Sequence, residues 1–410
     1  MSLESVVEVP LSAREREIVT ACLMSDHEAP YNVPVFVDFD EPVDEERLFR
    51  AVRMTVEACP ELCRAFRRDG VRLFATPATP VVERVEVLSS RAMNDVGDRR
   101  IPVLDTPLVH AAVISVRDTG RTRLYLNAHH AVVDGISLAL LLHTIADAYL
   151  TGAPPAFPRI ADAAEHHAAP RAIVGTEHLA MSESSEAAAA FVTALHGMRE
   201  AGVGTVQVRR TVRAPERTGF AASLGAVVPA LSVWTDTRSV LLSTALVGRD
   251  AAHRAAIGNF VRLQPLVFDV DAWPLVETPV LRRELGSLAV GMAIRATVPL
   301  SSGSAKLSDR IPATSVVFDY GTQSLVPRRI HEDLPGRIVE DDSYVDPKYG
   351  LHLSVDQDGD EQSLTLVAEG IPAHRLEQLA WLYAQQLRYG PLRSAPPESF
   401  THPTELAASA

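Results

Sequence analysis

The chain has 410 residues, of which 47% are hydrophobic and 22% are charged. At about 150 residues per domain, this length predicts two or three domains or one duplicated architecture, with enough apolar side chains for sizeable cores. A small single module and a wholly disordered chain are therefore excluded. The 39 Lys and Arg against 52 Asp and Glu give a formal net charge of −13, which repels phosphate backbones and argues against a nucleic-acid partner.

The sequence shows no signal for a membrane or for secretion. The most apolar stretch, residues 136–150, is broken by a histidine and an aspartate and is shorter than the ~20 residues that span a bilayer. The first twenty residues mix acidic and basic side chains without an apolar segment. Cys22, Cys59 and Cys63 are too few for a disulfide framework, and we expect buried thiols rather than a zinc site. We therefore expect a cytoplasmic protein with no membrane partner.

The first elements read as helix, strand, helix. Ser12 followed by Glu15 is a capping-box pattern that predicts a helix over residues 12–24. Residues 32–39 are rich in Val and Phe and predict a strand, and Asp44 then caps a second helix. That second helix would turn Leu48, Val52 and Val56 inward.

A hairpin comes next and leads into a loop and a helix. Residues 110–116 and 121–128 flank Asp118-Thr119-Gly120, which is a hairpin signal. Beyond Gly135, apolar residues recur at helical spacing, so residues 129–135 form a loop between a strand and a helix. The inward positions of that helix are Leu138, Leu141, Leu142, Ile145 and Tyr149.

The composition changes after this helix, and we place an interdomain connection near residues 152–175 because Gly and Pro cluster there before an Ala- and Glu-rich stretch. The second half again predicts strands, followed by a closing helix around Leu376 to Leu387 and a loose tail. The predicted strands are residues 240–246, 260–268, 315–319, 351–355 and 363–367.

Several familiar sites are excluded. Gln207 stands where a dinucleotide fingerprint beginning at Gly202 needs its third glycine. The Asp-rich turn from Asp356 lacks the glycine and the final glutamate of a calcium loop. No G-x-S-x-G elbow supplies a serine nucleophile. We therefore assign no cofactor-binding residue and no metal ligand.

The loop His129-His130-Ala131-Val132-Val133-Asp134-Gly135 can carry chemistry. Adjacent strand residues point to opposite faces, so one imidazole can face the core and the other an open site, where it can act as a general base. Asp134 could orient the loop through an ion pair, and Gly135 permits close approach of a substrate. From the residues alone, a merely hydrogen-bonded loop and a metal site remain open alternatives.

These seven residues match the HHxxxDG motif, and the chain resembles the condensation-domain superfamily, which includes nonribosomal peptide condensation domains, polyketide-associated acyltransferases and, more distantly, chloramphenicol acetyltransferase. Other segments follow the order of those domains: Pro10-Leu11-Ser12, Ala29-Pro30-Tyr31-Asn32-Val33-Pro34, Cys59-Pro60-Glu61-Leu62 with Phe66, Pro107-Leu108-Val109, Val247-Gly248-Arg249, and Ile257-Gly258-Asn259-Phe260-Val261 with Pro265-Leu266.

The resemblance implies an α/β fold of two chloramphenicol-acetyltransferase-like lobes that form a V-shaped pseudo-dimer with a central cleft. The implied divisions are an N-terminal lobe at 1–155, a connection at 156–175, a C-terminal lobe at 176–392 and a tail at 393–410. The implied catalytic residues are His130, as general base or as the group that positions the nucleophile, His129 and Asp134 as its supports, and Gly135 beside the pantetheine arm.

Two departures from the family pattern affect recognition. The arginine that would pair with the motif aspartate is replaced by Cys63, which leaves Arg64 and Arg249 as candidate partners of Asp134. The family's HQDYPFE segment is reduced to residues 298–300, and residues 262–263 are Arg-Leu instead of Asn-Thr. The sequence therefore does not predict which acceptor is recognised.

The resemblance implies a free-standing condensation enzyme of nonribosomal peptide, antibiotic or related biosynthesis. It would join an acyl or aminoacyl thioester on the phosphopantetheine of a carrier protein to an amine or hydroxyl acceptor, as a monomer with no permanently bound cofactor. Two alternatives are an acyltransferase that uses coenzyme A and an inactive module that recruits carrier proteins. Arg67-Arg68 or Arg328-Arg329 could dock an acidic carrier protein.

Overall fold

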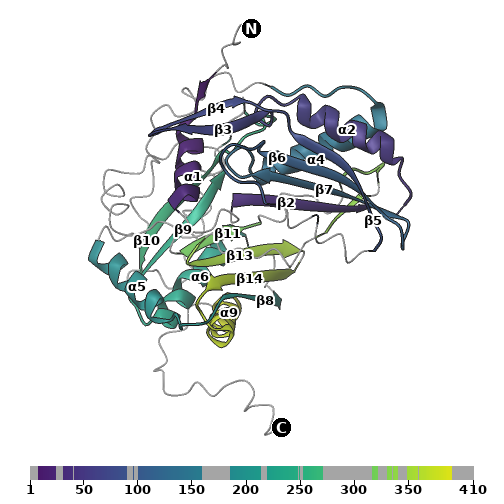
Figure 1. The fold of residues 1–410 in the computed structure, drawn as a ribbon. Helices are drawn as coiled ribbons and strands as arrows, with labels where there is room; N and C mark the ends of the chain where they lie inside the picture. The colour runs from purple at the N-terminus through teal and green to yellow at the C-terminus, as the bar shows by residue number, and fades with distance from the viewer. Residues whose placement is uncertain are drawn as a thin grey trace.

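The computed structural model describes the chain in two α/β lobes that lie side by side (Figure 1). The described residues are 8–24, 31–39, 41–89, 96, 100–158, 185–213, 219–247, 249, 253–270, 316–321, 330–334, 336–339, 349–358 and 360–389. Each lobe is built on one sheet with its own core, so the prediction of an α/β fold with two lobes is confirmed. The V shape and the lobe boundaries remain predictions; most of the connection and the whole tail lie outside the described residues.

The first lobe has a five-stranded sheet in the order β12-β2-β7-β6-β5, with α2 and α4 packed together on one side (Figure 1). Its elements are β2 (Asn32–Phe39), α2 (Glu45–Glu57), β5 (Val81–Val87), β6 (Val109–Val116), β7 (Arg121–His129), α4 (Gly135–Thr151) and β12 (Gly336–Val339). The inward residues predicted for α2, among them Leu48 and Val52, are completely buried. Burial of these apolar side chains holds the helices on the sheet.

Local signals in the first lobe act as expected. The Asp44 side chain accepts a hydrogen bond from the backbone N–H of Arg47 at 3.0 Å and so caps α2. β6 and β7 form the predicted antiparallel hairpin, and Gly120 takes a left-handed conformation with φ +64° in its turn. β2 has the bounds that the sequence predicts.

A small sheet and a helix stand beside this lobe. The sheet has the order β1-β4-β3, and its strands with the neighbouring helix are β1 (Val9–Pro10), α1 (Ala13–Met24), β3 (Arg64–Asp69) and β4 (Arg72–Pro77). The capping box predicted for α1 is present, since the backbone N–H of Ser12 donates to Glu15 at 2.8 Å and that of Glu15 donates to Ser12 Oγ at 3.2 Å.

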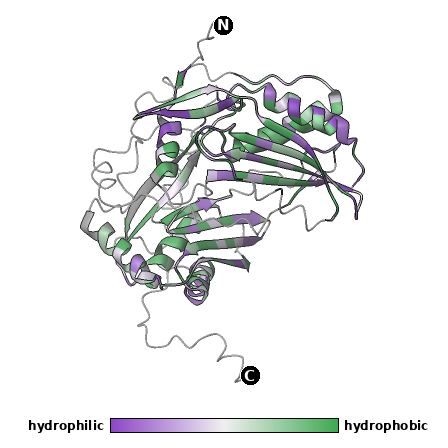
Figure 2. Cartoon of the chain, in the orientation of Figure 1, coloured by the Kyte–Doolittle hydropathy of each residue, from purple (hydrophilic) through white to green (hydrophobic). Residues whose placement is uncertain are grey.

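The second lobe has a six-stranded sheet in the order β10-β9-β11-β13-β14-β8, and α5, α6 and α9 cover one face of it (Figure 1). Its elements are α5 (Ser185–Gly197), β8 (Thr205–Arg213), α6 (Phe220–Thr235), β9 (Ser239–Val247), β10 (Val261–Asp269), β11 (Val316–Tyr320), β13 (Leu351–Asp358), β14 (Glu361–Glu369) and α9 (Ala373–Tyr389). Figure 2 shows hydrophobic and hydrophilic residues interspersed along the strands. The inner strands β6 and β7 are almost entirely buried, whereas the outer strands β5 and β8 have mostly half-buried or exposed residues. In the described residues no helix is both long and apolar enough to cross a membrane.

One strand crosses between the halves of the chain. β12 comes from the second half of the sequence but pairs antiparallel with β2 of the first lobe. Ile330 and Leu334, just before it, are buried in the first-lobe core. Gly336 is packed so tightly that an added Cβ would lie 2.8–2.9 Å from side-chain atoms of Val37, Ile330 and Phe39. The first sheet is therefore completed by residues from the far end of the chain.

Candidate active site

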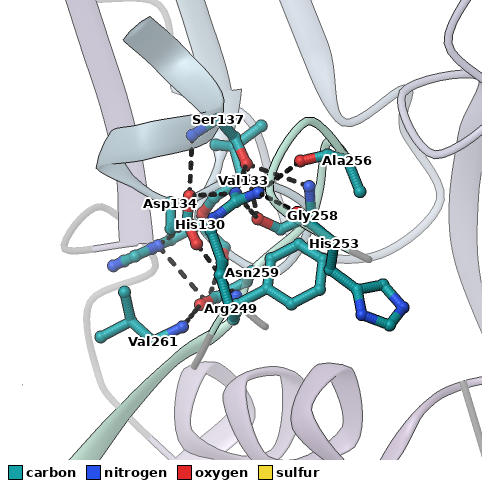
Figure 3. A network of polar contacts seen from close by, with 11 residues as sticks. His130, Val133, Asp134, Ser137, Arg249, His253, Ala256, Gly258, Asn259 and Val261 are labelled. Carbon is teal, nitrogen blue, oxygen red and sulfur yellow. Dashed lines mark hydrogen bonds and ion pairs between the residues drawn. The ribbon is translucent and has the colours of Figure 1, made fainter. Parts of the chain in front are cut away.

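The HHxxxDG loop joins β7 to α4, and Asp134 is the residue that begins the helix. Its backbone is extended, with φ −121° and ψ 179°, and its Oδ1 accepts a hydrogen bond from the backbone N–H of Ser137 at 2.8 Å. This satisfies one of the four backbone N–H groups that a helix leaves unpaired at its start. The cap fixes where the loop ends and where α4 begins (Figure 3).

Asp134 also forms a buried ion pair. Oδ1 lies 2.7 Å from Nη2 of Arg249, and the two side chains are only 1% and 4% exposed. Oδ2 accepts a hydrogen bond from the backbone N–H of Phe260 at 3.1 Å. Arg249 is thus the partner among the two predicted candidates, because Arg64 is paired instead with Glu15. A buried carboxylate with a charged partner and two backbone donors is held in one position.

Arg249 ties the second-lobe segment to the loop. Nη1 donates to the carbonyl oxygens of Ala256 at 2.6 Å and His253 at 3.0 Å. The guanidinium lies over the ring of Phe260, 4.3 Å from its centroid. Asp134 and these carbonyls together fix the turn that leads into β10 against the start of α4 (Figure 3).

Ser137 connects the start of α4 to Arg249 and Gly258, a role that the sequence did not predict. Its hydroxyl donates to the carbonyl of Gly258 at 2.7 Å, and it accepts from Nη2 of Arg249 at 2.6 Å and from the backbone N–H of Gly258 at 3.0 Å. These contacts use the one donor and both acceptor positions of a hydroxyl. No motif signals this role, because it depends on a turn more than a hundred residues away.

His130 has a defined tautomer. Nδ1 lies 2.8 Å from the carbonyl oxygen of Val133, and a carbonyl only accepts, so Nδ1 carries the proton. In the neutral ring the lone pair is then on Nε2, the atom that can take a proton from a substrate. Asn259 Nδ2 donates to the backbone carbonyl of His130 at 2.6 Å, and the His130 N–H donates to the carbonyl of Tyr31 at 2.7 Å. The His130 backbone is thus held from both lobes, and the Val133 carbonyl orients its ring.

His129 is a core residue. It is completely buried, its Nδ1 accepts from the backbone N–H of Ala131 at 3.2 Å, and its Nε2 lies 3.8 Å from Cys22 Sγ. Its ring stacks on Tyr31 with centroids 6.5 Å apart. Burial raises the pKa of the Tyr31 phenol to about 12, so the tyrosine stays neutral at ordinary pH. Both ring nitrogens of His129 face protein atoms, which suits a supporting role.

Gly135 faces open space. A Cβ added at this position would meet no heavy atom within 4 Å. The backbone at the start of α4 is therefore approachable beside His130, as close passage of a substrate requires. The structure brings His129, His130, Asp134 and Gly135 together with Arg249.

Asn259 is a site residue to which the sequence analysis gave no role, although it lies in a segment that supported the resemblance. Of the other predicted recognition elements, residues 298–300 and Arg328-Arg329 lie outside the described residues. Arg67 lies in the described part and pairs with Asp105 at 2.6 Å on an exposed surface, next to the exposed Arg68.

The first part of the chain matches a known family model. Residues 7–180 match the family model described as "Condensation domain". The match covers less than half of the 410 residues. The matched stretch includes the whole HHxxxDG loop, and Arg249, which pairs with the loop from the second lobe, follows later in the chain.

Relatives and solved structures agree. Malformin synthetase mlfA of Aspergillus homomorphus is 31% identical over 128 residues, which are 30% of this chain and 2% of the synthetase. The condensation domain from the monacolin K polyketide synthase MokA has a TM-score of 0.66 at 16% identity, over 95% of this chain and 99% of that domain. A variant of the starter condensation domain of rhizomide synthetase RzmA, in complex with C8-CoA, has a TM-score of 0.64 at 16% identity, over 92% and 94%.

Covered length and sequence identity decide what can be concluded from these similarities. This chain spans only 2% to 6% of the length of the curated relatives it matches. At 16% identity the structural similarity shows the fold, which is the chloramphenicol-acetyltransferase-like fold expected from the motif. The substrates of this protein must therefore be inferred from its own residues.

Proposed function

We propose that this protein is a condensation-domain acyltransferase that joins an acyl or aminoacyl thioester to an amine, or less readily to a hydroxyl. The donor would be carried on the phosphopantetheine of a separate carrier protein, in the assembly of a nonribosomal peptide or a related natural product such as an antibiotic. The observation that carries this proposal is the geometry of His130, whose Nδ1 proton is bound by Val133 and whose Nε2 lone pair is the basic atom of the ring.

The proposed step uses His130 as the base. Nε2 accepts a proton from the acceptor nitrogen as that nitrogen attacks the thioester carbonyl carbon. The C–N bond forms, the C–S bond breaks, and the thiolate leaves and takes up the proton. Asp134 and Arg249 position the loop without contacting the reacting atoms, because they are buried against each other. His129 supports the same loop from the core, and Gly135 gives the donor arm room to approach.

Reconstitution with purified components tests the proposal. The full chain is mixed with a donor-loaded carrier protein and an amine acceptor, and amide formation is followed by mass spectrometry. His130→Ala should lower turnover by about 10²–10⁴, the usual contribution of a general base. His374→Ala is the matched control, because His374 is an exposed residue of α9 outside the site. A His130→Ala variant that is folded by circular dichroism and keeps the wild-type rate would show that another group is the base.

A coenzyme A donor is the second candidate. It is favoured by the similarity to the RzmA starter domain, whose structure contains C8-CoA. The same assay with a free acyl-coenzyme A decides: turnover equal to that with the loaded carrier would make coenzyme A the donor. Carrier binding without product from either donor would instead indicate a recruitment module without catalysis.

We further propose that the enzyme works as a cytoplasmic monomer. The three cysteines are free thiols, which fits a reducing compartment.

The exposed Arg67 and Arg68 supply the positive charge that an acidic carrier needs on a protein of net charge −13. Reversal of both charges should raise the KM for the carrier-bound donor while leaving a small thioester analogue unaffected.

A further inference from the structure

A second cluster of ionisable side chains lies near the other end of α4, away from the loop that holds His130. His143 and Asp147 are four residues apart on the helix and so share one face. His331 comes from the segment that precedes β12 and reaches the same place. These three side chains meet from two parts of the chain that are almost two hundred residues apart.

The distances in this cluster suit a metal ion. His143 Nε2 lies 3.6 Å from Asp147 Oδ2, His331 Nε2 lies 3.5 Å from Asp147 Oδ1, and one potential ligand atom from each residue lies within 4.8 Å of the others. In a tetrahedral zinc site with bonds of 2.0–2.1 Å, neighbouring ligand atoms are about 3.3 Å apart. Small movements of the exposed His143 and Asp147 side chains toward the half-buried His331 would close the difference.

The backbone of the cluster is already fixed. Ile330 and Leu334, on either side of His331, are 1% and 3% exposed in the first-lobe core. The Ile330 N–H donates to the carbonyl of Gly336 at 3.1 Å, which closes the turn that carries His331. The helix holds the other two residues. A cation would therefore meet ligands that need little ordering, which favours affinity.

We propose that His143, Asp147 and His331 bind a zinc ion, which clasps the segment before β12 onto α4. Two imidazoles and one carboxylate leave a fourth position for water, as is common for zinc with three protein ligands. The surroundings favour a cation, because the adjacent Glu332 and Asp333 are exposed acids. The exposed fractions of the His143 and Asp147 side chains, 57% and 53%, leave the site open to solution.

Zinc binding would change the tautomer of His331. Its Nδ1 now accepts a hydrogen bond from the backbone N–H of Asp333 at 3.0 Å, and Oδ2 of Asp333 lies 4.0 Å from the same atom. A neutral ring that binds zinc through Nε2 carries its proton on Nδ1. The hydrogen bond from the Asp333 N–H would then be lost, and Nδ1 would turn to donate to this carboxylate. A carboxylate behind a histidine ligand is the usual arrangement in zinc proteins.

Titration of the full chain with zinc chloride, after treatment with a chelator and in competition with a chromophoric zinc indicator, tests the proposal. One zinc per chain should bind, and His143→Ala and His331→Ala should each weaken its Kd at least tenfold. His374→Ala should bind zinc as the wild type does, because its histidine lies on α9 outside the cluster. Zinc should also raise the Tm of the wild type and of His374→Ala but not of the two cluster variants.

The result is decisive in either direction because His143 is exposed and its replacement by alanine favours the helix. No measurable binding to the wild type, or a Kd unchanged in both cluster variants, would overturn the proposal. Loss of zinc binding in His143→Ala with unchanged amide formation would support a zinc site independent of the proposed catalysis.

Discussion

The two ends of α4 show two ways of joining the halves of this chain. At its start, Asp134 pairs with Arg249 of the second lobe, and both side chains are almost completely buried. Near its other end, Asp147 faces His331 from the segment before β12, and the aspartate is 53% exposed. Both contacts bridge long sequence separations, but only the first is enclosed by protein.

A buried carboxylate needs more protein partners than an exposed one. The Asp134 carboxylate has one ion-pair partner and two backbone donors, and Arg249 finds further acceptors in nearby carbonyls, since an unpaired buried charge would be costly. Asp147 can rely on water, so its partners need not be complete. The enclosed contact therefore suits a rigid site, and the exposed one leaves ligand atoms available to a cation.

The largest expected effect is at the enclosed end. Asp134→Ala would leave the Arg249 charge buried without its partner and would remove the cap of α4, at a cost of about 3–5 kcal/mol in the free energy of unfolding. Urea unfolding followed by fluorescence measures it. A loss below about 1 kcal/mol would mean that the pair is not enclosed as described.

The glycines at the two ends of α4, Gly135 as its first residue and Gly152 as its C-cap, give an intermediate effect and separate stability from chemistry. Gly152, the C-cap, has φ +73°, so Gly152→Ala should cost about 1 kcal/mol of stability and leave turnover unchanged. Gly135 needs no such conformation and faces open space, so Gly135→Leu should reduce turnover without loss of stability. Measuring unfolding and amide formation for both variants tests this; unchanged turnover in Gly135→Leu would exclude close passage of the donor there.

The smallest effect is expected at the exposed end. In chelator-treated protein, Asp147→Ala should change the free energy of unfolding by no more than about 0.5 kcal/mol, and even this should vanish in 1 M salt, because exposed ion pairs are weak and screened. Urea titrations at low and high salt measure it. A salt-independent loss comparable with that of Asp134→Ala would remove the distinction between the two ends.

Local patterns predicted much of the fold. Capping residues located α1 and α2, hydrophobic spacing located α4 and α9, and the turn before Gly120 located the β6–β7 hairpin. β3 and β4 were missed because in each strand two adjacent apolar residues stand among arginines and other small or polar residues, without the alternation typical of a strand. β12 was missed because four residues gain their structure only by pairing with a strand three hundred positions earlier.

The sequence predicted the residues of the motif but not the distant residues that contact them. The motif indicated the two histidines and Asp134, and the need for a cation limited the partner to two arginines. The choice of Arg249 depends on how the lobes meet, which no local pattern records. Ser137 and His331 carry no signal at all, because each gains its role from a distant segment.

The crossing of β12 has a consequence for anyone who would cut this protein into pieces. Without residues 330–339, β2 would become the outer strand of its sheet, and the backbone groups of residues 36–39 that face β12 would lose their partners. The surface now covered by Ile330 and Leu334 would be exposed as well. Uncovered strand edges and apolar patches promote aggregation. An N-terminal fragment that ends near residue 155 should therefore be insoluble when expressed alone, and a peptide spanning 330–339 supplied in trans is the natural reagent to rescue it.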